Sequence, residues 1–275
     1  PLGPEAFARK TARLVKDFGL NVAGGCCGTT PAHIRALREA LAGHALTHRT
    51  PVLDRSVASL YQAVSLRQEP RPLIVGERTN AQGSRAFRAC LERDDYDGMA
   101  SIAREQQREG AHMLDLCVAT AGRDEARDLE ELVKRVALQS RLPLMLDSTD
   151  PAVLARALAL APGKCVVNSI HFEEGEAKAR RVLDLCREHG AAVVGLCIDE
   201  SGMARTAGRK LEVARRLVDL VVGDFGFNPS DLILYPLTNT LASGGEESRR
   251  SALETLEALA EIKARLHGVR TLLGG

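Results

Sequence analysis

The sequence lacks an excess of charge of either sign. Its 275 residues include 37 Lys and Arg against 36 Asp and Glu, which gives a formal net charge of +1. Proteins that bind nucleic acid or an anionic membrane surface usually carry a marked basic excess. The composition therefore predicts no nucleic acid and no membrane as partner, and a small neutral or anionic ligand fits the charge balance better.

Long hydrophobic runs are missing as well. No stretch approaches the ~18 consecutive apolar residues of a membrane span, and the first residues lack a basic segment followed by an apolar one. The seven cysteines are an odd number, and they lie in apolar or glycine-rich segments without the regular spacing of a disulfide scaffold. We therefore expect a cytoplasmic protein.

A strand-then-helix pattern repeats from residue 71 onward. The strand-like runs are 73–76, 112–118, 143–147, 165–170, 191–198, 231–237 and 269–273. The helical stretches between them include 124–139, 151–160, 174–189, 209–222 and 246–267. Several runs are apolar on both faces, which suits a parallel sheet covered by helices. The pattern predicts either a doubly wound sheet or a closed (β/α)8 barrel of the TIM type.

The number of strands favours an incomplete barrel. A complete barrel has eight strands in about 250 residues, whereas seven runs lie between residues 71 and 275. The last run is followed by no closing helix, so we expect a barrel truncated near strand seven and a chain that is a fragment of a longer polypeptide.

The first 70 residues have a different character. Residues 4–18 and 30–41 are helical in pattern, and residues 20–23 form a short strand between them. This αβα piece is too small to fold alone. Residues 44–70 mix His, Thr, Pro and Gln, with one weak helical patch at 56–61. We expect a first domain at 1–43, an interdomain linker at 44–70 and the truncated barrel at 71–275.

Two adjacent cysteines stand in a glycine-rich turn between the strand and the second helix of the αβα piece. Cys26 and Cys27 lie within the sequence GGCCGT of residues 24–29. Glycines allow a tight turn that presents both thiolates at the mouth of a barrel, where they could bind zinc. A pair of buried thiols at a tight turn is the alternative. Two ligands cannot complete a tetrahedral zinc site, so further ligands would have to come from sequence outside this chain.

Polar residues follow the ends of the predicted strands. They are Glu77, Arg78 and Asn80 after the first strand, Asp115 in the second, Asp147 in the third and Asn168 in the fourth. Such groups are costly inside apolar strands unless they are hydrogen-bonded. Each is a candidate to line the mouth of the barrel, and the alternative is that it caps a neighbouring loop. Asp147 and Asn168 occupy corresponding positions on adjacent strands, which favours contact with a flat heterocycle that has an amino-pyrimidinone edge.

These motifs resemble a known family. GGCCGT resembles the signature of homocysteine-binding barrels, and GERTN at 76–80 followed by GSR at 83–85 is similar to the opening of the methyltetrahydrofolate-binding barrel of cobalamin-dependent methionine synthases. LDST at 146–149 and VNSI at 167–170 are similar to the third and fourth strands of that barrel. The cysteine doublet followed by a pterin barrel resembles the tandem arrangement of these methyltransferases.

The resemblance implies a function for each region. It implies that the first piece is the end of a TIM-type homocysteine-binding domain, with Cys26 and Cys27 as two of three zinc thiolates. It implies that the barrel binds 5-methyltetrahydrofolate, a folate, and presents its methyl group to cobalamin on a cobalamin-binding domain of the same polypeptide. The pterin ring would contact Asp147 and Asn168, and the folate pocket would include the loop of Gly83, Ser84 and Arg85. Glu77, Asn80 and Asp115 are among the further expected folate contacts.

Two positions depart from the family pattern. Tyr235 stands where the family has a pterin-gripping Asp, and Cys117 stands where it often has Asn. An Asn of strand seven that the family uses is expected just beyond Gly275. Three alternatives remain open: a dihydropteroate synthase-like enzyme, a corrinoid protein methyltransferase, and a non-catalytic docking fragment.

Overall fold

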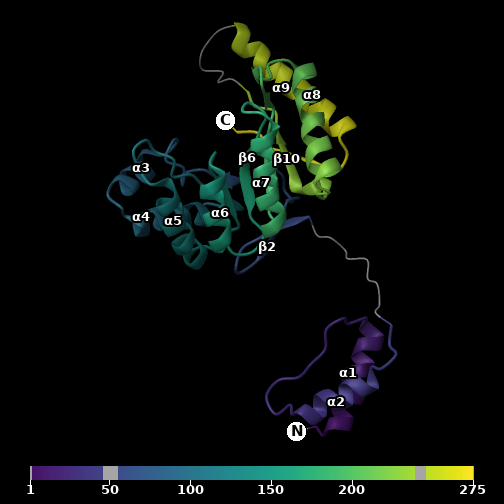
Figure 1. The fold of residues 1–275 in the computed structure, drawn as a ribbon. Helices are drawn as coiled ribbons and strands as arrows, with labels where there is room; N and C mark the ends of the chain where they lie inside the picture. Colours follow the sequence, from purple (N-terminus) through teal and green to yellow (C-terminus); the bar gives the residue numbers. More distant parts are fainter. Residues whose placement is uncertain (1, 46–54, 239–245, 275) are drawn as a thin grey trace. The chain divides into compact units, whose positions relative to one another are not determined.

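A computed structural model describes residues 2–45, 55–238 and 246–274, with the side chains of 246–249 left out. The chain divides into two compact units, Pro1–Leu53 and Asp54–Gly275, and each is described by itself. Figure 1 shows the first as a pair of helices and the second as a sheet covered by helices.

The N-terminal unit is built on two packed helices, α1 (Pro4–Phe18) and α2 (Pro31–Ala40). Each begins with a proline in its first turn, where the missing N–H group is not needed. Both helices were predicted, and both are confirmed. The predicted strand at 20–23 is wrong, because these residues have no strand conformation. A strand exists only where a neighbour accepts its backbone hydrogen bonds, and the described part of this unit contains no strand to pair with.

The second unit contains a curled sheet of seven parallel strands. They are β3 (Val75–Gly76), β4 (Met113–Leu116), β5 (Leu144–Asp147), β6 (Val166–Ile170), β7 (Ala192–Leu196), β10 (Leu232–Tyr235) and β11 (Arg270–Thr271). Their spatial order is β11-β10-β7-β6-β5-β4-β3, and every neighbouring pair is parallel. The sheet confirms the predicted TIM-type α/β architecture, with all seven predicted strands present.

Helices cover the outer face of this sheet (Figure 1). They are α3 (Arg85–Glu92), α4 (Tyr96–Arg108), α5 (Glu125–Gln139), α6 (Pro151–Leu160), α7 (Glu176–His189), α8 (Ala207–Val218) and α9 (Glu246–Arg265). A π-helical turn (Asp219–Asp224) continues α8, a 3-10 turn (Pro229–Asp231) precedes β10, and a small hairpin, β8 (Ile198–Asp199) and β9 (Gly202–Met203), follows β7. Among the described helices, none has the length and apolar character to cross a lipid bilayer.

The hydrophobic core has two parts, one on each face of the sheet. The larger part lies between strands and helices, and its members include Leu114, Leu146 and Val167. The smaller part lies inside the curl, and we call it the floor. It consists of Val57, Met113, Met145, Val166, Ala192, Val194 and Ile233.

A short hairpin that precedes the barrel contributes to the floor. It consists of β1 (Ser56–Ala58) paired with β2 (Ala63–Ser65). Val57 is fully buried in the floor, and Ala58 exchanges two backbone hydrogen bonds of 3.0 Å with Lys164, just before β6. The helical patch expected at 56–61 is therefore wrong. These residues were expected to be part of a linker, but they form an element of the barrel unit. The reason is that Val57 packs against the apolar side chains of the floor.

Candidate functional site

The inward-facing side chains of the sheet form two layers. The lower layer is the apolar floor. One step toward the carboxyl ends of the strands, the inward positions of β4, β5, β6 and β10 are the polar residues Asp115, Asp147, Asn168 and Tyr235, whereas that of β7 is Leu196. Asp147 of β5 pairs in register with Asn168 of β6. Parallel strands bring their carboxyl ends to one edge, and barrel enzymes keep their chemistry there. The polar layer therefore lies where a ligand site is expected, and we call it the mouth.

Four of the predicted site residues meet in this mouth. The side-chain amide of Asn80 donates to Asp115 Oδ2 at 3.1 Å and to Asp147 Oδ2 at 3.4 Å. The amide of Asn168 donates to Asp115 Oδ1 at 3.4 Å. Asn80 and Asn168 thus both donate to the carboxylate of Asp115, although they lie 88 positions apart in the sequence. The cluster is a hydrogen-bonded unit rather than a set of separate loop caps.

Asn80 is held in place by the loop that follows β3. It forms an isolated parallel bridge with Cys117, and the N–H of the next residue, Ala81, donates to the carbonyl of Cys117 at 2.8 Å. The Oδ1 atom of Asn80 accepts from the N–H of Gln82 at 2.9 Å. Both ends of its amide are therefore used within the protein.

Burial changes the acidity of the two central carboxyl groups. Burial, followed by the nearby Asp147, raises the pKa of Asp115 to about 7. Burial also raises the pKa of Asp147 to about 6, partly offset by a hydrogen bond with the Cys117 thiol. The thiol itself, buried beside these carboxylates, has its pKa raised to about 12. A pair of carboxyl groups with pKa values near neutrality is typical of functional sites.

Glu77 and Arg78 follow β3 but have different surroundings. The negative charge of Glu77 contributes to the raised pKa of both Asp115 and Asp147, which places it near the mouth. The Arg78 guanidinium instead pairs with Glu105, at 3.7 Å, and with Glu109. Arg78 therefore serves as an anchor to α4, and Glu77 remains a candidate site residue.

The predicted loop residues Gly83, Ser84 and Arg85 lead into α3. Ser84 is the N-cap of this helix, and its hydroxyl oxygen accepts from the N–H of Phe87 at 3.3 Å. The Ser84 N–H donates to the Asn80 carbonyl at 2.9 Å. Gly83 and Arg85 are exposed. Ser84 thus fixes the loop to Asn80, whereas the other two residues remain open to a ligand.

Tyr235 ends β10 and is half-buried beside the floor. Burial raises its pKa, a hydrogen bond from the Gly274 N–H opposes this shift, and the charge of Glu77 adds to it. Because its oxygen accepts from Gly274, the hydroxyl hydrogen is left to donate. Tyr235 therefore offers the mouth a donor where a carboxylate would offer acceptors.

Sequence reasoning missed Lys210, a fully buried lysine on α8. Its ammonium group donates to the carbonyls of Pro236 and Leu237, at 2.8 and 2.5 Å, and to the Thr255 hydroxyl at 3.0 Å. These bonds tie the end of β10 to α8 and α9. A signal was available, because Lys210 lies three and four residues before Val213 and Ala214 on an apolar helix face.

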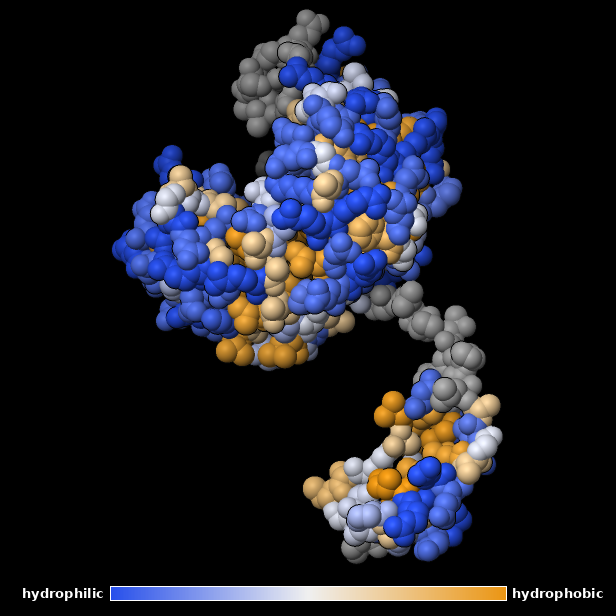
Figure 2. Space-filling view, in the orientation of Figure 1, coloured by the Kyte–Doolittle hydropathy of each residue, from blue (hydrophilic) through white to orange (hydrophobic). Residues whose placement is uncertain are grey.

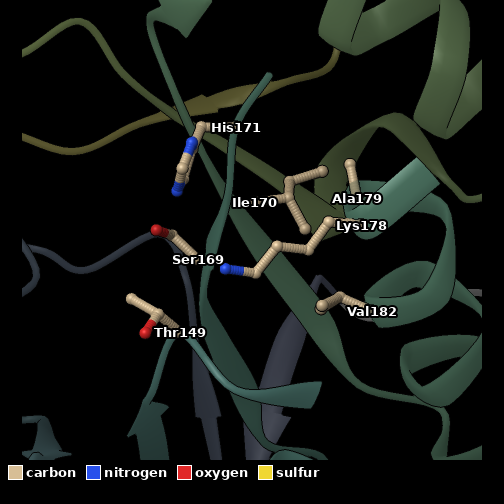
Figure 3. Close-up of a pocket in the computed structure, with 7 residues that line it drawn as sticks. All are labelled: Thr149, Ser169, Ile170, His171, Lys178, Ala179 and Val182. Atoms are coloured by element: carbon tan, nitrogen blue, oxygen red, sulfur yellow. The ribbon is translucent and has the colours of Figure 1, made fainter. Parts of the chain in front are cut away.

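A small hollow with polar and apolar side chains in its lining lies between β6 and α7, beside Asn168 in sequence. Its lining includes Thr149, Ser169, His171 and Lys178, which Figure 3 shows around one space. Lys178 forms an ion pair of 2.5 Å with Glu174. The hollow lies on the helix-covered side of the sheet, because Ile170, Ala179 and Val182 of its lining belong to the larger part of the core.

The cysteine doublet lies in the N-terminal unit. Cys26 and Cys27 are both exposed, and neither is in a disulfide. Within the described ranges, no group of three His, Cys, Asp or Glu residues could hold a metal ion. The doublet offers two sulfur ligands, and a tetrahedral zinc site needs two more.

Sequence comparisons match two families. The model of pterin binding enzymes matches residues 76–275, and the model of homocysteine S-methyltransferases matches residues 1–41. The chain is 46% identical over 277 residues to the methionine synthase of Mycobacterium tuberculosis and 44% identical over 282 residues to that of Mycobacterium leprae. Each match covers 100% of this chain, and the chain spans 23% of the length of each relative.

Solved structures of a dihydropteroate synthase have a similar fold. The Xanthomonas albilineans enzyme with 4-aminobenzoic acid aligns with a TM-score of 0.57 and 16% identity, over 78% of this chain and 75% of that chain. The same enzyme in complex with 7,8-dihydropteroate aligns with a TM-score of 0.54 and 17% identity, over 78% and 76%. This likeness supports the barrel architecture of residues 54–275.

Proposed function

Because the chain belongs to the family of pterin binding enzymes, we propose that its barrel binds 5-methyltetrahydrofolate and presents the N5-methyl group to cob(I)alamin during the synthesis of methionine from homocysteine. The observation that carries this proposal is the pairing of Asp147 with Asn168 above an apolar floor. The similarity to the methionine synthases of two mycobacteria supports the reaction.

The chemistry of the mouth suits the flat ring of a pterin. The amino-pyrimidinone edge of a pterin carries N–H donors, and the carboxylate of Asp147 and the carbonyl oxygen of Asn168 are acceptors. The aromatic ring needs an apolar surface, which the floor supplies. Gly83, Ser84 and Arg85, together with Glu77 and Tyr235, complete the proposed folate contacts, whereas Asn80 and Asp115 hold the cluster together.

The proposed reaction depends on positive charge at the pterin nitrogen. A methyl group leaves a neutral tertiary amine poorly, so N5 must gain a proton or a strong hydrogen bond in the transition state. Cobalamin, bound to a separate cobalamin-binding domain, would supply the cobalt(I) nucleophile. The carboxyl groups of Glu77, Asp115 and Asp147 stabilise positive charge in the mouth, and no side chain of this barrel has to attack the methyl group.

The N-terminal unit is proposed to be the end of a homocysteine-binding domain. Its match to homocysteine S-methyltransferases covers residues 1–41 and includes Cys26 and Cys27. Two adjacent thiols have the right chemistry for zinc but are an incomplete set, so residues outside this chain would supply the rest. We propose a homocysteine-binding piece at 1–43 and a folate-binding barrel at 71–275. Within the expected linker at 44–70, the β1–β2 hairpin packs on the barrel and is counted with it. We also propose a cytoplasmic location, which suits seven unpaired cysteines.

Calorimetric titration of the complete protein with 5-methyltetrahydrofolate tests the proposed function. We expect saturable binding, and rapid mixing with cob(I)alamin should then give methylcobalamin. A protein that binds folate but transfers no methyl group would be a docking module. Condensation of a pterin pyrophosphate with 4-aminobenzoic acid would instead show a dihydropteroate synthase-like enzyme and refute the proposal.

A further inference from the structure

Asp115 lies deepest among the polar side chains of the mouth. It is 1% exposed, whereas Asp147 and Asn168 are partly exposed. The Thr79 hydroxyl donates to the Asp115 carbonyl at 2.6 Å and accepts from the Gln106 amide at 3.1 Å, so the backbone at Asp115 is fixed from behind. A ligand in the mouth would therefore contact the residues around Asp115 rather than Asp115 itself.

The contacts of Asp115 determine which way the neighbouring amides face. A carboxylate only accepts hydrogen bonds, so the nitrogen atoms of both side-chain amides, Asn80 and Asn168, turn toward it. The Asn80 oxygen is already taken by the Gln82 N–H. The Asn168 oxygen is the amide atom left to face a ligand, next to the Asp147 carboxylate on the adjacent strand.

We propose that Asp115 is a positioning residue that sets the hydrogen-bond polarity of the mouth. By accepting from both amides, it leaves Asn168 Oδ1 and the Asp147 carboxylate as two adjacent acceptors. These acceptors select a planar heterocycle whose bound edge carries neighbouring N–H donors. The inference rests on the proposed function and narrows it, because it names the residue that fixes the orientation of the acceptors on β5 and β6.

The surroundings of Asp115 make this polarity sensitive to its charge. The titratable groups that face it are Asp147 on β5, Glu77 after β3 and Cys117 on its own strand. The negative charges of Asp147 and Glu77 disfavour ionisation of Asp115, which would add a further negative charge beside them. A protonated Asp115 could donate to an amide oxygen and so turn the Asn168 nitrogen toward the ligand, which would reverse the pattern.

Exchanging the two side chains tests this inference. In Asp115→Asn, an amide replaces the carboxylate and can accept from only one of the two facing amides. Because the Gln82 N–H holds the Asn80 oxygen, the Asn168 amide is the one that must rotate, and it then presents its nitrogen to the ligand. We expect the dissociation constant for 5-methyltetrahydrofolate to rise about tenfold or more in the complete protein. In the double variant Asp115→Asn with Asn168→Asp, the amide nitrogen at position 115 donates to the carboxylate at position 168. The second oxygen of that carboxylate then faces the ligand as an acceptor. The double variant should recover most of the lost affinity.

The control is Asp128→Asn, which changes a fully buried aspartate on α5 that contacts Tyr96 and Arg123. It should alter thermal stability without changing folate affinity. A double variant that binds no better than Asp115→Asn, or a single variant that binds as the wild type does, overturns the inference alone. Absence of folate binding in the wild type would overturn the proposed function and this inference with it.

Discussion

At the scale of single residues, the mouth depends on a few groups that share hydrogen bonds. Asp147 is the partly exposed carboxylate of the cluster, and it contacts Asn80 and the Cys117 thiol. Replacing Asp147 by Ala removes a charged hydrogen-bond acceptor. An N–H group of the bound ligand, already removed from water, is then left without a partner. We expect the Asp147→Ala variant to bind 5-methyltetrahydrofolate more weakly by about 2 kcal/mol or more, measured by calorimetry. The exposed Asp184→Ala on α7 is the control, and equal affinity in both variants would remove Asp147 from the site.

The same carboxyl groups should make stability depend on pH. A carboxyl group whose pKa is raised by folding holds its proton in the folded state at pH values where the unfolded chain has already lost it. Its effect on the free energy of unfolding is therefore absent at low pH, and this free energy decreases as pH rises toward the folded pKa. For Asp115 and Asp147, with folded pKa values of about 7 and about 6, the free energy of unfolding should fall between pH 5 and pH 8. The pKa values of Glu131, Glu174 and Asp94 are lowered by hydrogen bonds with neighbouring Arg and Lys side chains. The stability that these three carboxylates contribute is therefore lost only below this pH range.

Urea unfolding of the ligand-free protein at pH 5, 6, 7 and 8 measures this dependence. The slope should become smaller in Asp147→Asn, which removes one of the two groups. A wild-type stability that rises steadily from pH 5 to pH 8 would contradict the prediction.

At the scale of elements, the β1–β2 hairpin is part of the barrel rather than a linker. Val57 is fully buried in the floor, whereas Leu60 in the hairpin turn is 55% exposed. Val57→Ala should destabilise the barrel by about 2 kcal/mol, because it removes two buried methyl groups and leaves a cavity. Leu60→Ala should change stability by no more than about 0.5 kcal/mol. Denaturant unfolding of both variants checks this, and equal losses would mean that the hairpin is not seated in the floor.

The elements differ in how far the sequence could predict them. All seven barrel strands were predicted, and several of them are apolar on both faces. The closeness of Asp147 and Asn168 followed from their equivalent strand positions. The hairpin was missed because its three-residue strands carry one core residue, Val57, which is too short a signal for a periodicity. The strand expected at 20–23 depended on a partner strand, and the described residues of the N-terminal unit form none. The part played by Asn80 in the cluster could not be predicted, because it depends on the conformation of a loop.

At the scale of the whole molecule, two compact units carry separate candidate sites. Hydrophobic side chains, among them Leu14, Phe18, Val22 and Ile34, are exposed on the N-terminal unit, and Figure 2 shows apolar surface there. We propose that further parts of a homocysteine-binding barrel cover this surface. The zinc and folate sites should therefore be independent of each other.

Elemental analysis of the complete protein tests this independence. We expect one zinc ion per chain, no retained zinc in Cys26→Ala, and unchanged folate binding in that variant. Cys90→Ala, which changes a partly buried thiol on α3, should keep its zinc. Equal zinc in the wild type and Cys26→Ala would show that the doublet is a structural turn.

The bonds between Ala58 and Lys164 also bear on how the molecule is made. The hairpin leaves the ribosome before the barrel strands do, yet its backbone partner lies 106 residues later in the sequence. The hairpin of residues 56–65 cannot dock until β4, β5 and the start of β6 have been synthesised, which takes about 5 to 20 seconds at ~5–20 residues per second. During that interval Val57 has no apolar partners in the floor, and the edge of β1 that later bonds to Lys164 is unpaired. An exposed apolar side chain beside an unpaired strand edge favours aggregation, so the nascent chain carries this risk until β6 emerges.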